Sequence, residues 1–448
     1  MIKNFYTPND FSGSDSERIQ AAIYEAKKTG ADRVVIPKYN SGTDSMKWVI
    51  DKTILLPSDI TIVLDNCYMV MADDTYCQMF ANENLFDERG RDKSNEQKNI
   101  NIIGCGNAEI SGGKENKLNE FTSKKDGNPH VSANVLIYLY NVRDFKIEGF
   151  RISDQRWWSI LLLYARYGSV KNIDFKINFR HSYGVWRNQD GIDLRSGCNN
   201  ISIENITGET GDDMIALTTL ISKNHFEHSL KIEGRDTDIH DCTIRNVKGF
   251  SNMCAIVRLL NQHGNKIYNI SISDIFDVGT PKLESKVQMV LRIGEDSYYE
   301  SFAERAKPDE LYNISINNIY SKALSAIHLE LAAKNLHASN IFVTEKGHHA
   351  VTLGRFYMNN VFMYIPERYE EYEKERLIPD KDLNKKTTLE NVQIENIYYS
   401  AKPDYYKPAV CAVSNAELIN VSVKNIYAED DIKKEEYFNM EEKNIVLN

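Results

Sequence analysis

The chain has 448 residues, of which 42% are hydrophobic, and its formal net charge is -10. This length and composition allow a large hydrophobic core. The negative charge argues against nucleic acid or an anionic membrane as the main partner, because both are themselves negatively charged.

The first predicted element is an amphipathic helix over residues 14–30. Ser14 or Asp15 can serve as its N-cap, and Gly30 is placed to end it. Its expected apolar face consists of Ile19, Ala22, Ile23 and Ala26. Residues 33–37, an apolar β-branched run that ends in proline, are expected to form a first strand.

A seven-residue pattern recurs from residue 144 onward. Its first position is polar, and its second and fourth positions are apolar. Its sixth position is Asn, Asp or Gly, its seventh is usually apolar, and its third and fifth positions vary. Clear copies begin at Asp144, Asn200, Asn269, Asn313, Asn391 and Asn420, and weaker copies begin at Asn172, Asp241 and Asn335. The alternation of apolar and polar residues predicts half-buried strands, and steps of 22 to 56 residues, several near 28, indicate stacked coils.

These repeats predict an all-β fold, a right-handed parallel β-helix that forms a single domain over residues 1–448, with the helix at 14–30 as its cap. A Rossmann-type sheet is disfavoured because no long amphipathic helices separate the strands. The recurring Asn or Asp after each strand is expected to mark a left-handed turn and to hydrogen-bond along the stack. The densely charged segment 366–386 is interpreted as a surface insertion between coils rather than a lid.

The seven cysteines are odd in number and lack any Cys-x-x-Cys spacing, so we expect reduced core thiols and neither a disulfide framework nor a zinc site. The apolar run 157–165 is too short to span a membrane. No apolar leader region follows Met1. We therefore expect a cytoplasmic protein, or a secreted one if a leader has been removed.

Two acidic motifs indicate a catalytic site. Asn188-Gln189-Asp190-Gly191 precedes the coil that begins at Asn200, and Gly211-Asp212-Asp213 follows its strand. Because stacked coils rise by about 4.8 Å, we expect Asp190 beside Asp212 and Asp213. Crowded carboxylates suit glycoside hydrolysis, which needs one protonated acid and one carboxylate that activates water. Ordinary turn residues and a calcium site remain alternatives.

On these motifs the chain resembles glycoside hydrolase family 28, the polygalacturonase family, whose members are right-handed parallel β-helices that invert the anomeric centre. The resemblance implies that Asp212 is the general acid, and that Asp190 with Asp213 holds and deprotonates the water. It also implies a carbohydrate substrate and substrate-binding roles for Asn188, Arg258 and Arg292. No metal and no cofactor are expected.

The chain departs from the family pattern at two places. The Gly-His-Gly motif is expected on the coil after the aspartate pair, where the chain has Cys254 and no histidine. Gly347-His348-His349 lies several coils later and is expected at the surface. Arg292 matches the arginine of the Arg-Ile-Lys motif, but Gly294 replaces its lysine. Losing that cation weakens the case for a galacturonate polymer, and Arg258 is considered as partial compensation, with a surface ion pair as its alternative role.

Aromatic residues close to these motifs in sequence form a candidate wall for sugar stacking: Trp157, Trp158, Trp186, Tyr298 and Tyr299. Core packing is the alternative role, and alternation predicts that Trp157 and Trp158 face opposite sides.

The leading functional hypothesis is an inverting glycosidase that acts on a polysaccharide or its oligosaccharides. A polysaccharide lyase on the same fold is the first alternative, although no obvious Lys or Arg base lies between the two aspartate motifs. A non-catalytic carbohydrate-binding β-helix is the second, because the family's histidine is absent. Fold alone does not separate the three.

Overall fold

The computed structural model describes residues 4–178, 188–221, 226–252, 254–279, 289–294, 304–323, 325–345, 349–354, 356–357, 378–379, 387–401, 410–413, 416–428, 435–438 and 445–447. The chain divides into two compact units. The first comprises Met1–Gly211 with Ser229–Asp236, and the second comprises Asp212–His228 with Thr237–Asn448.

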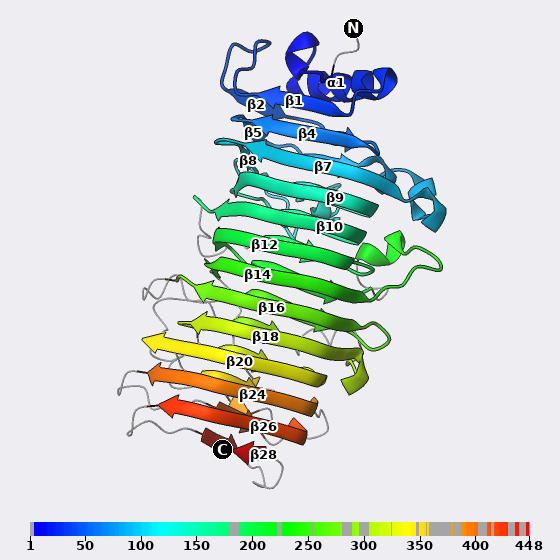
Figure 1. Cartoon of the computed structure of the whole chain (residues 1–448). Helices are drawn as coiled ribbons and strands as arrows, with labels where there is room; N and C mark the ends of the chain where they lie inside the picture. The colour runs from blue at the N-terminus through cyan, green and yellow to red at the C-terminus, as the bar shows by residue number, and fades with distance from the viewer. Residues whose placement is uncertain are drawn as a thin grey trace. The chain divides into compact units, whose positions relative to one another are not determined.

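The first unit is a stack of parallel strands that follows the helix α1 (Asp15–Thr29). One wall consists of β1 (Arg33–Pro37), β4 (Ile60–Asp65), β7 (Gln97–Cys105), β9 (Ile137–Ser153), β10 (Ile160–Lys176) and β12 (Asn199–Thr210), each paired with the next (Figure 1). One column of core residues is formed by successive register partners on these strands: Val34, Ile62, Ile102, Ile147, Val170 and Ile203. Every member of this column is fully buried.

Shorter strands complete the coils of the first unit. They are β2 (Lys47–Ile50), β3 (Ile54–Leu56), β5 (Tyr68–Met71), β6 (Phe80–Asn82), β8 (Glu109–Ser111) and β11 (Ile192–Leu194). β2 pairs with β5 and β5 with β8, while β3 pairs with β6 and β10 with β11, all in parallel. Stacks of parallel strands that are joined in this order form the coils of a β-helix, as the repeat predicts.

The second unit repeats this plan. Its long wall consists of β14 (Ile239–Ser251), β16 (Ile267–Asp277), β18 (Leu311–Ser321), β20 (Ala333–Glu345), β24 (Thr387–Ala401), β26 (Ala416–Ala428) and β28 (Ile445–Leu447) (Figure 1). Its opposing wall consists of β13 (Ile215–Thr219), β15 (Ala255–Asn261), β17 (Met289–Ile293), β19 (Ser325–Leu329), β21 (His349–Leu353), β25 (Val410–Val413) and β27 (Glu435–Phe438). The predicted right-handed parallel β-helix is therefore confirmed.

The remaining described elements are a two-stranded antiparallel pair and short 3-10 helices. An antiparallel pair joins β22 (Phe356–Tyr357) to β23 (Ile378–Pro379). Short 3-10 helices lie at Pro8–Asp10, Glu83–Leu85, Glu88–Arg91, Lys93–Asn95, Val131–Asn134, Phe226–Leu230 and Pro308–Glu310. Apart from β23, the predicted insertion at 366–386 lies outside the described residues. None of the described helices combines the length and apolar character needed to cross a membrane.

The repeat asparagines form the predicted hydrogen-bonded ladders. At the sixth position of the pattern, Asn425 donates to Asn396 at 2.9 Å, and both have positive φ. A second ladder, which was not predicted, joins the first position of successive copies: Asn420 donates to Asn391 at 2.8 Å, and Asn391 to Asn335 at 3.1 Å. The long strands run through both positions, so the asparagines bend each strand rather than end it. The expectation that they follow the strand was wrong in this respect.

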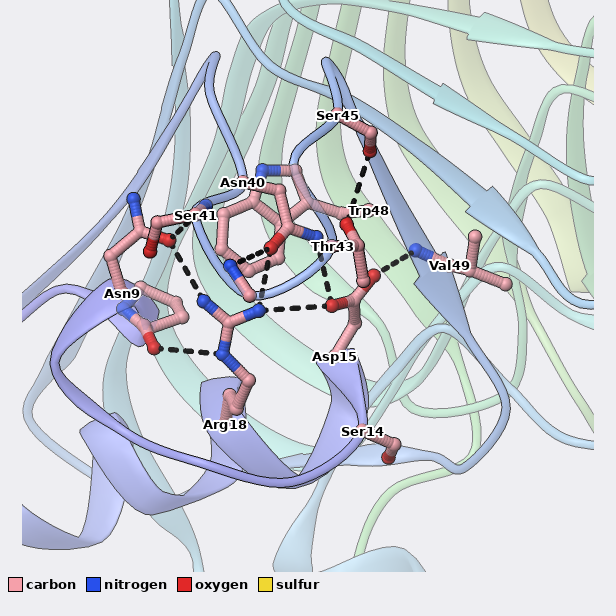
Figure 2. Close-up of polar contacts among 12 residues, drawn as sticks. Asn9, Ser14, Asp15, Arg18, Asn40, Ser41, Thr43, Ser45, Trp48 and Val49 are labelled. Carbon is pink, nitrogen blue, oxygen red and sulfur yellow. Dashed lines mark hydrogen bonds and ion pairs between the residues drawn. The ribbon is translucent and has the colours of Figure 1, made fainter.

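The N-terminal cap is built around a buried charge. Ser14 is the N-cap of α1 in a capping box with Glu17, and Gly30 ends the helix with φ 78°, as predicted. Arg18 is only 2% exposed and donates to Asp15 at 3.3 Å and to Asn40 at 2.5 Å (Figure 2). Asp15 also accepts from the backbone N–H of Val49 at 2.7 Å, so this pair fastens the helix to β2 (Figure 2).

Replacing Asp15 with Ala should destabilise the first unit by about 3–5 kcal/mol, because it leaves the buried Arg18 charge without its carboxylate. The free energy of unfolding, measured by urea titration followed by circular dichroism, tests this. Glu25→Ala is the matched control, since Glu25 pairs with the exposed Lys28 and should cost about 0.5 kcal/mol or less. Equal losses for the two variants would contradict the role of the buried pair.

Candidate active site

The opposing wall of the second unit carries a column of polar side chains. The described residues of β13, β15, β17, β19 and β21 are buried along their whole length, so the face turned away from the core is also covered. On this outer face Ala216 is followed in register by the polar residues Arg258, Arg292, His328 and Thr352. Apolar neighbours flank each of them and fill the core, because neighbouring side chains on a strand point to opposite faces.

Asp213 and Arg258 form a buried ion pair in this column. Nε of Arg258 lies 2.8 Å from Oδ2 of Asp213, and the two residues are 7% and 0% exposed. The other carboxylate oxygen, Oδ1, accepts the backbone N–H of Ala255 at 3.1 Å. Asp213 therefore has both oxygens engaged within the second unit. Arg258 thus forms an ion pair, as its alternative role required, but the pair is buried rather than at the surface.

Asp212 differs from Asp213 in its access to solvent. It is half-buried, and its Oδ1 accepts the backbone N–H of Asp213 at 3.0 Å. Of the three predicted catalytic aspartates it is the most accessible, since Asp190 is 1% and Asp213 0% exposed. An acid that protonates a leaving group must reach the substrate, and the exposure of Asp212 suits that task.

Arg292 pairs with a residue that the sequence analysis did not identify. Its Nη2 lies 3.7 Å from Oε2 of Glu330, and the same oxygen lies 3.3 Å from Nε2 of His328. Burial opposes ionisation of Glu330, but the hydrogen bond from His328 and the charge of Arg292 outweigh it and hold the pKa of Glu330 below its usual range. Thr352 contacts Nδ1 of His328 at 2.6 Å and completes this buried chain.

Cys254 connects the two halves of the site. Arg292 donates from Nη1 to its sulfur at 3.3 Å, and one carboxylate oxygen each of Asp212 and Asp213 lies within 4.8 Å of it and of each other. Burial, with the negative charge of Asp213, raises the pKa of the Cys254 thiol well above its ordinary value.

In the first unit the motif that contains Asp190 is locked by hydrogen bonds. The carbonyl of Asp190 accepts the N–H of Ser159 at 3.0 Å. Gln189 and Gln155 each donate a side-chain N–H to the other's backbone carbonyl, at 2.7 and 3.1 Å. Asn188 is half-buried, and its side-chain oxygen accepts the indole N–H of Trp158 at 3.2 Å.

The two tryptophans lie against each other rather than on opposite sides. The rings of Trp157 and Trp158 stack at 4.0 Å, and Arg195 lies over Trp158 at 4.9 Å. The alternation prediction was wrong here because the two residues precede β10 and are not part of a strand. Trp157 donates to the carboxylate of Glu120, whose pKa is raised by burial. Trp157 and Trp158 are 4% and 7% exposed, so the pair is packed within the first unit and offers little surface for a sugar.

Several other expectations have definite outcomes. His349 is 3% exposed, so the prediction that it lies at the surface was wrong. The expectation of core thiols holds for the four buried cysteines but not for Cys105, which is exposed. Trp186, Tyr298 and Tyr299 lie outside the described residues.

Asp190 belongs to the first unit and the Asp212–Asp213 pair to the second. Their adjacency, like the assigned roles of all three, stays a prediction.

Gly294 explains why the motif lysine is missing. Its φ is 99°, a left-handed conformation that side chains disfavour, and a Cβ here would lie 2.8 Å from the backbone nitrogen of Leu331. The backbone N–H groups of Glu330 and Leu331 both donate to the carbonyl of Ile293, at 2.8 and 3.1 Å. A lysine at position 294 would therefore require the backbone to move at Ile293–Gly294 or at Glu330–Leu331.

Sequence reasoning missed His328 and Glu330. Residues 325–329 form a short, largely apolar strand, and a single histidine in such a strand is more often a packing residue than part of a site. The signal that could have found them is their spacing. His328 lies one register step from Arg292, and Glu330 follows two residues later.

The family resemblance is confirmed by a match of residues 48–234 to the model for glycosyl hydrolases family 28. The matched region includes both aspartate motifs and ends before Arg258 and Arg292. It supports a glycoside hydrolase. No curated protein matches the chain.

Solved structures with the same fold are distant in sequence. An endo-xylogalacturonan hydrolase from Aspergillus tubingensis aligns over 99% of this chain and 98% of its own, with 13% identity and a TM-score of 0.56. A family 28 exopolygalacturonase from Yersinia enterocolitica aligns over 96% and 79%, with 12% identity and a TM-score of 0.50. A surface adhesin of Streptococcus pneumoniae aligns over 95% and 91%, with 11% identity and a TM-score of 0.52. The fold thus occurs in both enzymes and an adhesin.

Replacing Gly294 with Ala should destabilise the second unit more than replacing Gly264, which has a φ of 85° and no atom within 4 Å of an added Cβ. The left-handed backbone alone should cost about 1–2 kcal/mol in both variants. The close contact with Leu331 should add about 1–3 kcal/mol in Gly294→Ala only. Urea unfolding of the two variants gives the difference, and equal losses would show that the contact with Leu331 relaxes freely.

Proposed function

We propose that this protein is an inverting glycoside hydrolase that acts on a polysaccharide or its oligosaccharides. The observation that carries the proposal is the setting of Asp212. It is a half-buried carboxyl next to a fully buried carboxylate, Asp213, which a guanidinium and a backbone N–H hold in place. The family match over residues 48–234 supports the reaction class.

In the proposed mechanism Asp212 donates a proton to the oxygen of the leaving group. Asp190 and Asp213 would hold the attacking water and accept its proton, so that the water attacks the anomeric carbon from the opposite face and inverts it. The ion pair with Arg258 limits how far Asp213 can move, which favours a fixed orientation of the carboxylate towards the reacting groups.

Asn188 has a supporting role in this proposal. Its side-chain oxygen is occupied by the indole N–H of Trp158, which fixes the orientation of the amide. One N–H of the amide already hydrogen-bonds the carboxylate of Glu120, and the proposal assigns the other to a sugar hydroxyl. The stacked Trp157–Trp158 pair would then act as a rigid support for Asn188 rather than as a sugar platform.

Replacing Asp212 with Asn should lower kcat by about 100- to 10,000-fold, because the amide cannot donate the required proton while its shape is nearly unchanged. Hydrolysis of an oligosaccharide panel, followed by release of reducing ends, measures the loss. Asp309→Asn is the matched control, since Asp309 is exposed on the same unit, and it should retain wild-type activity. Full activity of Asp212→Asn would remove Asp212 as the acid.

The anomer of the first product tests the stereochemistry. Proton NMR during the first turnovers should show the inverted anomer before mutarotation equilibrates the two forms. A retained anomer would contradict the water-activating role of Asp190 and Asp213. An unsaturated product that absorbs in the ultraviolet would instead favour a lyase, and binding without turnover would favour a carbohydrate-binding protein.

A further inference from the structure

We propose that the site in the second unit selects an uncharged sugar, and that Glu330 sets this specificity by neutralising Arg292. The inference rests on the proposed function, because it names the substrate class of that same site. It comes from the charges that surround Asp212 and from the backbone path at Gly294.

Arg292 is already paired with a carboxylate of this protein. Its Nη2 lies 3.7 Å from Oε2 of Glu330, and its Nη1 donates to the sulfur of Cys254 at 3.3 Å. Arg292 and Glu330 are 7% and 5% exposed, so little water screens their attraction. The charge of Arg292 and the hydrogen bond from His328 also keep Glu330 ionised, since they hold its pKa below the usual range despite burial.

Arg258 is also paired with a carboxylate of this protein. Its Nε lies 2.8 Å from Oδ2 of Asp213, and the pair is buried. Two guanidinium groups of the outer column are therefore each balanced by a carboxylate. A third carboxyl, the half-buried Asp212, lies in the same cluster and adds a further negative group to the site.

The position that follows Arg292 by two residues offers no replacement cation. Gly294 has a φ of 99°, and a Cβ there would lie 2.8 Å from the backbone nitrogen of Leu331. A sugar carboxylate entering this site would meet Glu330 and Asp212 and would have to displace a buried carboxylate from Arg292. A neutral sugar avoids that repulsion, because its hydroxyl groups can accept from a guanidinium and donate to a carboxylate without disturbing either pair.

The first test compares matched substrates with the wild-type protein. The probes are p-nitrophenyl α- and β-glycosides of galactose and glucose with the corresponding uronides, and an oligogalacturonide before and after reduction of its carboxylates to hydroxymethyl groups. We expect kcat/KM to be at least tenfold higher on the neutral member of the pair that is cleaved. A tenfold preference for the uronide member would overturn the inference and leave the proposed hydrolase intact.

The second test removes the negative charge that neutralises Arg292. Glu330→Gln keeps the size of the side chain and should raise the ratio of kcat/KM on the uronide to kcat/KM on the neutral sugar by at least tenfold. Both values come from one preparation, so a loss of folded protein cancels from the ratio. An unchanged ratio would overturn the role of Glu330.

Two further variants separate specificity from a general disturbance. The double variant Arg292→Gln with Glu330→Gln removes both charges and should restore the neutral preference of the wild type. Glu395→Gln is the matched control, because Glu395 pairs with His337 at 3.2 Å on the exposed long wall, and it should leave the ratio unchanged. A double variant that keeps the uronide preference of Glu330→Gln would show that Arg292 is not the group that Glu330 neutralises.

Binding separates this inference from the proposed function if no substrate is cleaved. Isothermal titration with galactose and galacturonate on the wild type and Glu330→Gln should show the same change of preference. That result without hydrolysis would refute the hydrolase and support the specificity of the site. Absence of binding to both sugars in both proteins would overturn the inference as well.

Discussion

In-register stacking of parallel strands is the constraint on which the site depends. A slip of one residue would turn every side chain of a strand to the opposite face, and the apolar columns of each unit forbid such a slip. Within the second unit Ile244, Ile272, Ile316 and Ala338 follow one another in this way, all fully buried. The opposing wall keeps an equally strict register, and this alone brings Arg258, Arg292 and His328 into one outward column from strands far apart in the chain.

Such a column is only tolerable if its charges are balanced. A buried guanidinium without a partner is strongly destabilising, whereas a pair with good geometry recovers much of the desolvation cost. Each of these two guanidinium groups has a carboxylate nearby: Asp213 lies 2.8 Å from Arg258, and Glu330 lies 3.7 Å from Arg292. The N-terminal cap uses the same solution for Arg18 and Asp15. Balanced burial fixes the positions of these groups.

The sequence predicted the elements that a local pattern encodes and missed the relations between residues on different coils. Strands that begin at Asn269 or Asn313 could be predicted because alternation and spacing recur, and the helix could be predicted from Ser14 and Gly30. The Asp212–Asp213 pair was visible because the motif is local. Glu330 was not, since its role exists only through its position relative to Arg292, a coil away, and no local pattern records that relation. The same holds for Trp157 and Trp158, whose stacking depends on a turn that alternation does not describe.

Gly294 and the pairing of Arg292 with Glu330 have a single structural origin. The segment that follows β19 crosses the end of β17 so closely that the N–H groups of Glu330 and Leu331 share the carbonyl of Ile293. This crossing leaves no room for a Cβ at Gly294 and at the same time delivers the carboxylate of Glu330 to Arg292. Restoring a lysine at position 294 would require moving the segment, and moving the segment would withdraw Glu330. The glycine at 294 and the pairing of Arg292 with Glu330 therefore both follow from the same backbone path.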